Sequence, residues 1–208
     1  MVIILEGPDE GGKTTLAHAI AGLAIHNNLQ PQLVKSPAGK TTQWEEPWEI
    51  WVKIHEARAH QFPSHLYILD RVPEVSEPIY AYAHHRSPRY RHPIRGWAEF
   101  GEVFPIFCLP NSSDPLTITM PPESFSDHID PFGNPIDHYL IRVLYDYTAS
   151  MFEQIIPQTF FWDRYLDMES HWRSLVRNYG ARDTRISVNT DVAVSFSDAL
   201  EIGNRIYA

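Results

Sequence analysis

The segment LEGPDEGGKTTLA, residues 5–17, constrains the fold of this chain more than any other feature. It contains a glycine, four intervening residues and then Gly-Lys-Thr, which is the spacing of a phosphate-binding loop. The loop residues with this spacing, together with one further glycine, are Gly7, Gly11, Gly12, Lys13 and Thr14. Such a loop needs a buried strand before it and a helix after it, because its backbone N–H groups converge on phosphate at a helix N-terminus.

Both flanking elements are present in the sequence. Residues 2–5 form a short apolar and β-branched run, which predicts a buried strand, and residues 14–25 carry alanine and leucine at helical spacing. We therefore expect the phosphates of ATP, with Mg²⁺, to bind here. The residues predicted to contact the nucleotide are Gly7, Asp9, Glu10, Gly11, Gly12, Lys13, Thr14 and Thr15, with the Thr14 hydroxyl as a metal ligand.

The rest of the chain alternates between strand-like and helix-like segments. Further strands are predicted at 32–35, 65–70, 103–109 and 159–162, with a shorter one at 186–189. Helices are predicted at 14–25, from 76 to about 85, and at 136–156, 168–179 and 197–205. This order predicts an α/β fold of the P-loop NTPase type, a three-layer sandwich in which helices flank a mainly parallel five-stranded sheet.

The length of 208 residues fits a single domain, residues 1–208. Within it, residues 36–62 and 84–101 are candidates for a nucleotide-binding or lid subregion. Residues 111–134 are rich in proline, serine and aspartate and have no helical period, so they predict a loop-rich insertion.

Composition limits the class of partner. The formal charge of −9 argues against a protein that wraps a nucleic-acid backbone, whereas a small phosphorylated ligand needs only a local positive site. No apolar run approaches the length of a membrane span, no signal sequence is apparent, and the single cysteine, Cys108, cannot form an intramolecular disulfide. We expect a cytoplasmic protein without a membrane partner; a homodimer is left open.

Two blocks of the sequence, EGPDEGGKTT at residues 6–15 and LDRVPEVSEPIYA at residues 69–81, resemble the thymidylate kinase family, especially its compact bacteriophage-encoded members. The resemblance is specific over these blocks and only topological over most of residues 82–208. It implies an ATP- and Mg²⁺-dependent kinase of nucleoside monophosphates, with dTMP or a related, even modified, pyrimidine deoxynucleotide as the acceptor.

The resemblance also implies roles for individual residues. Asp9 would bind the 3′-hydroxyl of the deoxyribose, Asp70 would lie near the metal and the attacking phosphate oxygen, and Arg71 would contact the substrate or the transferring phosphoryl group. Lys13, Asp70 and Arg71 are therefore the predicted catalytic residues, and Thr14 and Asp70 the predicted metal ligands. Further substrate contacts are implied for Ser76, Glu77 and Tyr80.

The sequence departs from the family pattern in its cations. Lys35 stands where many members have an arginine for the monophosphate, and lysine cannot make the bidentate contact of arginine. The usual lid region is poor in arginine, so Arg89 or Arg91, which precede residues 103–109, are candidates for the closing cation or a phosphate contact. A second Asp-Arg pair, Asp163-Arg164, is interpreted as unrelated to catalysis.

Three other functions stay open at this point. A nucleoside kinase would phosphorylate a sugar hydroxyl and would need a carboxylate such as Glu6 or Asp70 as general base. The acceptor could also be a hydroxymethylated base within DNA, which the acidic charge disfavours. A regulator that holds ATP without transferring phosphate is the non-enzyme alternative.

Overall fold

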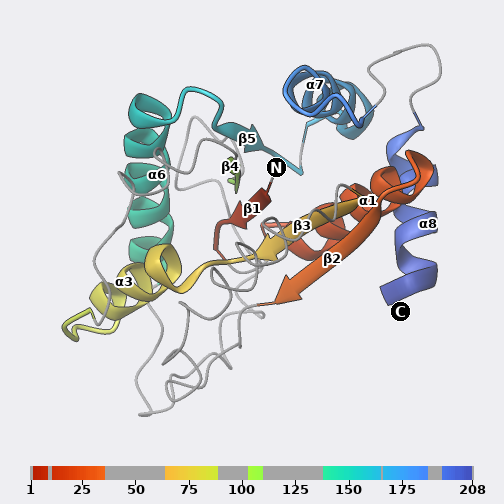
Figure 1. Ribbon diagram of the computed structural model, residues 1–208. Helices are drawn as coiled ribbons and strands as arrows, with labels where there is room; N and C mark the ends of the chain where they lie inside the picture. The colour runs from red at the N-terminus through yellow and green to blue at the C-terminus, as the bar shows by residue number, and fades with distance from the viewer. Residues whose placement is uncertain are drawn as a thin grey trace.

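The computed structural model describes residues 2–8, 11–35, 64–88, 103–109, 138–164, 166–186 and 194–207. Within them, five strands form one parallel sheet in the order β2-β3-β1-β4-β5 (Figure 1). The strands are β1 Val2–Glu6, β2 Gln30–Lys35, β3 His65–Asp70, β4 Val103–Cys108 and β5 Phe160–Trp162. The predicted α/β fold with a parallel five-stranded sheet is confirmed.

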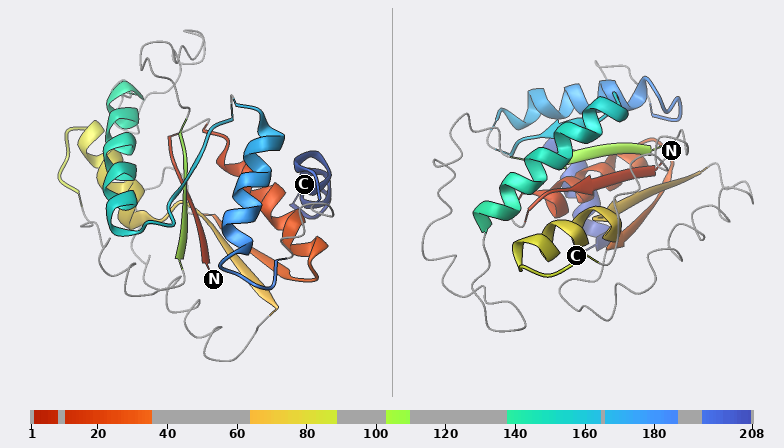
Figure 2. Two further views of the ribbon diagram at one scale, coloured as in Figure 1. Left: turned by 90° about the horizontal axis from the view of Figure 1, so that it is seen from above. Right: turned by 90° about the vertical axis from the view of Figure 1, so that its left-hand side faces the viewer.

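Helices cover both faces of the sheet (Figure 2). One face carries α1 Lys13–His26, α7 Met168–Gly180 and α8 Phe196–Tyr207, and the other carries α3 Pro73–Ala83 and α6 His138–Ile155. Strand β1 shows why a continuous apolar run suits this position: Ile3 and Leu5 pack in the first core, whereas Val2 and Ile4 pack in the second. The sheet is thus the middle of three layers.

Most element boundaries lie within three residues of those predicted. Helix α1 ends where the sequence suggested, because the Asn27 side chain donates to the Leu23 carbonyl at 2.8 Å and Asn28 takes a left-handed φ of 59°. Helix α3 starts at Pro73, three residues earlier than predicted, since a proline fits the first turn of a helix. The short strand predicted at 186–189 falls largely outside the described residues, and Ile186 itself is not in a strand.

Helices α1 and α8 approach each other more closely than side chains would allow. Gly22 of α1 faces the backbone of Ala199, and Gly203 of α8 faces the backbone of His18. A Cβ atom built on either glycine would overlap the carbonyl oxygen opposite it. These two glycines therefore let the C-terminal helix pack directly against the helix that begins at the phosphate loop.

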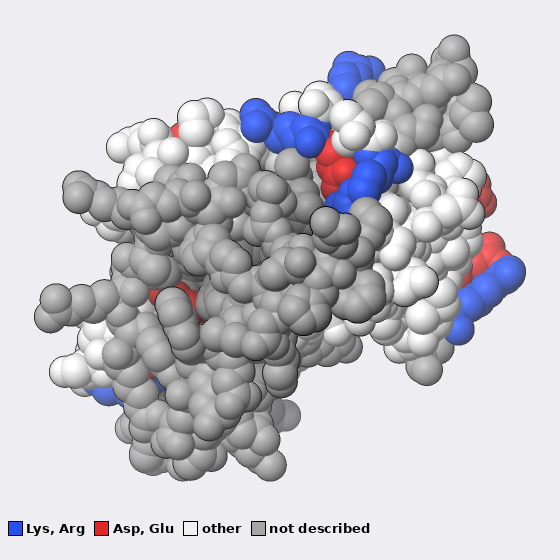
Figure 3. All heavy atoms as spheres, in the orientation of Figure 1, with Lys and Arg blue, Asp and Glu red and all other residues white. Residues whose placement is uncertain are grey.

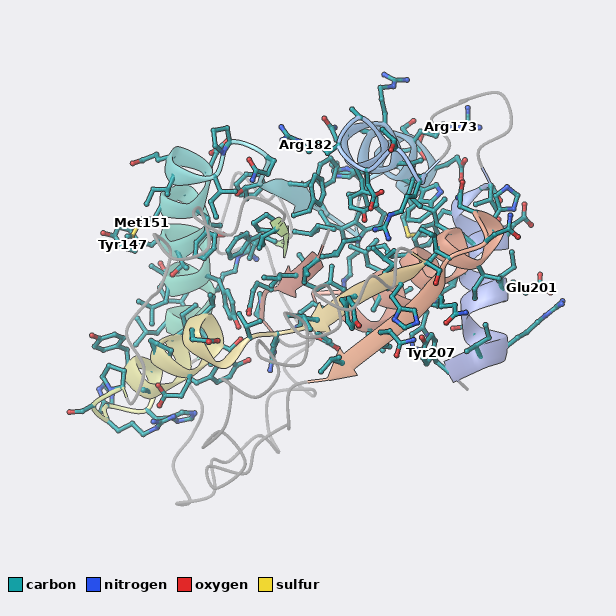
Figure 4. All side chains as sticks on the ribbon, in the orientation of Figure 1. Tyr147, Met151, Arg173, Arg182, Glu201 and Tyr207 are labelled. Atoms are coloured by element: carbon teal, nitrogen blue, oxygen red, sulfur yellow. The ribbon has the colours of Figure 1, made fainter. Side chains whose placement is uncertain are left out.

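Replacing either glycine by alanine should destabilise the protein, although alanine normally favours a helix by about 1 kcal/mol over glycine. Because backbone must move to admit the methyl group, we expect Gly22→Ala and Gly203→Ala each to lower the free energy of unfolding by about 3 kcal/mol in urea titrations. Glu201→Ala, on the exposed side of α8 (Figure 4), is the control and should change it by about 0.5 kcal/mol or less. Unchanged stability in both glycine variants would show that the helices can separate without cost.

Candidate functional site

The carboxyl ends of the parallel strands bring the predicted site residues to one edge of the sheet. Leu5 of β1 lies opposite Asp70 of β3, and Glu6 lies opposite Phe107 of β4. After β1 the chain continues to β2 and β3 on one side of β1, and then crosses to β4 and β5 on the other side. Ligands of open α/β sheets bind in the crevice at such a switch point. The loop after β1, the Asp70-Arg71 turn after β3 and the residues after β4 and β5 all meet here.

The phosphate loop rests on the end of β4. Gly7 has a φ of 143°, and a Cβ there would lie 2.5 Å from the carbonyl oxygen of Cys108; a Cβ at Gly11 would lie 2.6 Å from the same atom. Glycine is therefore required by the close approach of two backbones. Burial raises the pKa of the Cys108 thiol to about 12, so Cys108 acts as a neutral packing residue beneath the loop.

The start of α1 offers an anion-binding end. Gly12, the N-cap, has a left-handed φ of 84°, no side-chain cap hydrogen bond is found among the described residues, and the first turn has no acidic residue. The helix N-terminus therefore has N–H groups and positive dipole character that no side chain of its own neutralises. The Lys13 ammonium folds back into the loop, with Nζ donating to the carbonyl of Pro8 at 2.5 Å.

An oxygen pair lies next to this helix end. The Thr14 hydroxyl donates to Oδ2 of Asp70 at 3.4 Å, so the two predicted metal ligands are neighbours. A hydroxyl and a carboxylate are hard oxygen donors that fit Mg²⁺, which usually takes one or two protein ligands and completes its shell with phosphate oxygens and water. Among the described residues no cluster of three or more His, Cys, Asp or Glu side chains could hold a metal, so a cage made of protein ligands alone is not found there.

Arg71 links the phosphate loop to α3. Its guanidinium donates to the carbonyl of Gly7 at 3.3 Å and to the Tyr80 hydroxyl at 2.9 Å, and its Cζ lies 5.1 Å from the centroid of the Tyr80 ring. Its backbone has a φ of 67°, a left-handed conformation that is uncommon for residues with a side chain. Strained backbone of this kind is often found at functional sites.

Glu6 is a buried carboxyl behind the loop. It is 1% exposed, and it accepts hydrogen bonds from the Val72 amide at 2.7 Å, the Ser76 hydroxyl at 2.8 Å and the Tyr145 hydroxyl at 3.3 Å. Desolvation raises the pKa of Glu6 from 4.5 to about 7, although these hydrogen bonds and the nearby charges of Arg71 and Lys13 oppose the shift. Its charge therefore changes close to neutral pH.

The predicted substrate contacts on α3 take different positions. Ser76 and Glu77 are buried, Ser76 against Glu6 and Glu77 in an ion pair with Arg86. The described contacts thus place both side chains behind the surface of the site, and their contact with a nucleotide stays a prediction. Tyr80 is partly exposed and contacts Arg71, and its role toward a sugar or base also stays a prediction.

Several predicted residues fall outside the described residues. They are Asp9, Glu10, Arg89 and Arg91, most of the subregion at 36–62 and 84–101, and the insertion at 111–134. For Lys35 the structure describes the backbone, which lies opposite Asp70 at the end of β2, but not the side chain. Thr15 lies exposed in the first turn of α1.

Arg164 and Tyr145, which both lie near the site, were not among the sequence candidates. The Asp163-Arg164 pair, interpreted from the sequence as unrelated, follows β5, and a Cβ on Gly12 would lie 3.6 Å from Cβ and Cδ of Arg164. The sequence did give one signal for this pair: it follows a predicted strand, and the carboxyl ends of parallel strands meet at the same edge of the sheet. Tyr145 lies in the middle of α6, and no local pattern connects it to Glu6.

Comparisons with known proteins support the fold. No family model matches the sequence, and no curated protein matches it. Among solved structures, the YorR protein of Bacillus subtilis, in complex with phosphorylated GDP, aligns with a TM-score of 0.52 and 19% identity, over 87% of this chain and 97% of that chain. At this identity the likeness shows that the two chains share a fold.

The described helices include none that is both long and apolar enough to cross a bilayer. On the face shown in Figure 3, the charged side chains of the described residues lie in separate groups of both signs and form no continuous basic surface.

The buried carboxyl predicts a pH dependence of stability. Because the folded pKa of Glu6 is about 7 and the ordinary value is 4.5, the folded protein holds a proton between these pH values that the unfolded chain has lost. Glu6 should thus make the free energy of unfolding fall as pH rises from 4.5 to 7, with a slope of at most about 1.4 kcal/mol per pH unit.

Urea titrations from pH 5 to 8 should show that Glu6→Gln removes this component of the slope, while Glu201→Gln, at an exposed position of α8, keeps it. Identical slopes in the wild type and Glu6→Gln would contradict the raised pKa.

Proposed function

We propose that this protein transfers the terminal phosphoryl group of ATP to a nucleoside monophosphate, with dTMP or a related pyrimidine deoxynucleotide as the preferred acceptor. One observation carries the proposal: the anion-binding start of α1, the Thr14–Asp70 oxygen pair and the Arg71 guanidinium meet at a single edge of the sheet. The Thr14 hydroxyl lies 3.4 Å from Oδ2 of Asp70, and the Arg71 guanidinium lies 3.3 Å from the Gly7 carbonyl oxygen in the loop.

The donor triphosphate lies in the phosphate loop in this proposal. The backbone N–H groups from Gly11 to Thr15 and the Lys13 ammonium neutralise its charge, and Lys13 exchanges the Pro8 carbonyl for phosphate oxygens. Phosphoryl transfer requires alignment and charge neutralisation more than covalent participation by the protein. When bound, Mg²⁺ supplies further charge neutralisation, and Thr14 and Asp70 are the residues that would hold it.

Arg71 serves the acceptor side. It directly follows β3, the strand next to β1, so its side chain approaches the phosphate loop from the β3 side. Two of its partners, the Gly7 carbonyl and the Tyr80 hydroxyl, are neutral acceptors. A phosphate brings a full negative charge and forms stronger, charge-assisted hydrogen bonds, so it can draw the guanidinium away from them.

The environment of Glu6 disfavours this residue as the general base of a nucleoside kinase. A sugar hydroxyl must lose a proton to a base within hydrogen-bond reach, whereas a phosphate monoester is ionised at neutral pH. Glu6 is 1% exposed and both of its oxygens accept hydrogen bonds from the protein, so it is badly placed to serve as that base. Asp70 lies beside Thr14 and is better placed to orient a metal-bound water or the acceptor.

The shared fold with YorR, a protein whose structure contains phosphorylated GDP, is compatible with a nucleotide ligand in this chain. It gives no preference for the base. Thymine as the base rests on the resemblance of two sequence blocks to the thymidylate kinase family.

Replacing Lys13 by alanine should reduce turnover with ATP by about 10²–10³-fold, because the developing charge loses its closest cation. Stability should change by about 1 kcal/mol, as for a typical single substitution. The control is Arg173→Ala, a cation on the outer side of α7 (Figure 4), which should leave turnover unchanged. Full activity of the Lys13 variant would refute the role of the loop.

Mass spectrometry with ATP-Mg²⁺ and a panel of nucleosides and nucleoside monophosphates should show dTMP converted to the diphosphate, and thymidine left unmodified. Asp9→Ala should lower kcat/KM for dTMP about tenfold, by loss of a hydrogen bond to a charged group, and should have no effect with the 3′-deoxy analogue. Phosphorylated thymidine would identify a nucleoside kinase. Tight ATP binding without transfer to any acceptor would identify a regulator.

A further inference from the structure

The buried contacts of Glu6 define a cluster that lies directly behind Arg71. The Glu6 cluster consists of Glu6, Ser76 and Tyr145, which are 1%, 0% and 0% exposed. Its members are joined by bonds of 2.8 Å from Ser76 to Glu6, 3.0 Å between Ser76 and Tyr145, and 3.3 Å from Tyr145 to Glu6. Since none of the three reaches the surface, any effect on a reaction must pass through other residues.

The Glu6 cluster contacts the backbone of the turn that contains Arg71. Two successive amides of the turn donate to two successive residues of β1: the Arg71 amide to the Leu5 carbonyl at 2.9 Å, and the Val72 amide to the Glu6 carboxyl at 2.7 Å. These bonds span the left-handed φ of 67° at Arg71, a conformation that persists only where its surroundings enforce it. The Glu6 carboxyl is therefore one of the groups that fix where the Arg71 side chain starts.

The guanidinium of Arg71 is linked to the same cluster by a second route. It hydrogen-bonds the Tyr80 hydroxyl, and the Tyr80 ring meets the Tyr145 ring edge to face, with centroids 6.4 Å apart. Tyr145 thus contacts both the carboxyl that holds the turn and the ring that holds the guanidinium. It belongs to α6, a helix whose sequence gives no sign of a part in the site.

The chemistry at position 6 sets the direction of the hydrogen bonds in the cluster. Three donors point at the side chain, namely the Val72 amide and the hydroxyls of Ser76 and Tyr145. A carboxylate can accept from all three, whereas an amide of the same shape can accept from Val72 only if its N–H groups face the two hydroxyls, which must then turn and accept instead of donating. Burying a carboxyl costs stability, so the cluster provides orientation at the expense of stability.

We propose that Glu6 and Tyr145 are positioning residues for Arg71: the Glu6 cluster fixes the Arg71 turn and, through Tyr80, its guanidinium, so that α6 becomes part of the acceptor side of the site. The proposal rests on the proposed function for the phosphate that Arg71 meets. The orientation of Arg71 itself can be measured without any substrate.

The structural arm of the test follows the Nε–Hε resonance of Arg71 in ¹⁵N-arginine-labelled protein, assigned by its absence in Arg71→Ala. Tyr145→Phe removes only a hydroxyl, and Tyr147→Phe makes the same change two residues away on the exposed face of α6 (Figure 4). The resonance should shift in Tyr145→Phe and Glu6→Gln and stay in place in Tyr147→Phe. An unmoved resonance in a folded Tyr145→Phe protein overturns the proposal, whether or not Glu6→Gln folds.

The kinetic arm is a double-mutant cycle. Tyr145→Phe should lower kcat about tenfold, as expected for a slightly misplaced cation, with KM for ATP unchanged. In the Arg71→Ala background the same substitution should have no further effect, because it acts through Arg71. Equal losses in both backgrounds would show a general structural role and overturn the proposal. If the wild type phosphorylates no acceptor, the proposed function fails, and the resonance of Arg71 alone decides the inference.

Discussion

The parallel pairing of β1 with β3 on one side and with β4 on the other is the constraint on which the site depends. It brings the ends of three strands into one plane, so that the loop after β1 can rest on the Cys108 carbonyl and the turn after β3 can bond to Leu5. Two glycines of the loop are required by this contact and not only by the spacing of a phosphate-loop motif, because a Cβ at Gly7 or Gly11 would meet the β4 backbone. One packing requirement thus serves both structure and chemistry.

The two helical layers support this arrangement in different ways. Helix α1, which presents its N-terminus to the loop, is held by the glycine-mediated contact with α8. Helices α3 and α6 on the other face pack around a core of their own, and a polar cluster inside that core reaches the Arg71 turn. The phosphate loop is therefore supported by close backbone packing, and the Arg71 turn by buried hydrogen bonds, which are directional and leave less freedom to a side chain.

Much of the fold could be predicted because its signals are local. An apolar run followed by a glycine-rich loop and an alanine-rich helix leaves few alternatives, and strands alternating with helices imply a parallel sheet. The placement of Arg164 and Tyr145 could not be predicted in the same way. Arg164 follows a strand that the sequence predicted, but it lies beside Gly12 only because β5 pairs with β4. Tyr145 reaches Glu6 because α6 packs against α3, and no pattern near Tyr145 indicates that contact.

The sequence by itself determined the strand, loop and helix around Lys13 and the α/β class, since periodicity, glycine spacing and helix propensity act over a few residues. It also marked Asp70 and Arg71 as the pair at the end of a buried strand. Only the tertiary structure decided that Glu6 is enclosed and bonded to Val72, Ser76 and Tyr145, and that Arg71 turns toward Tyr80. These facts depend on contacts between residues 9 to 139 positions apart, which arise only when the layers pack and water is excluded from between them.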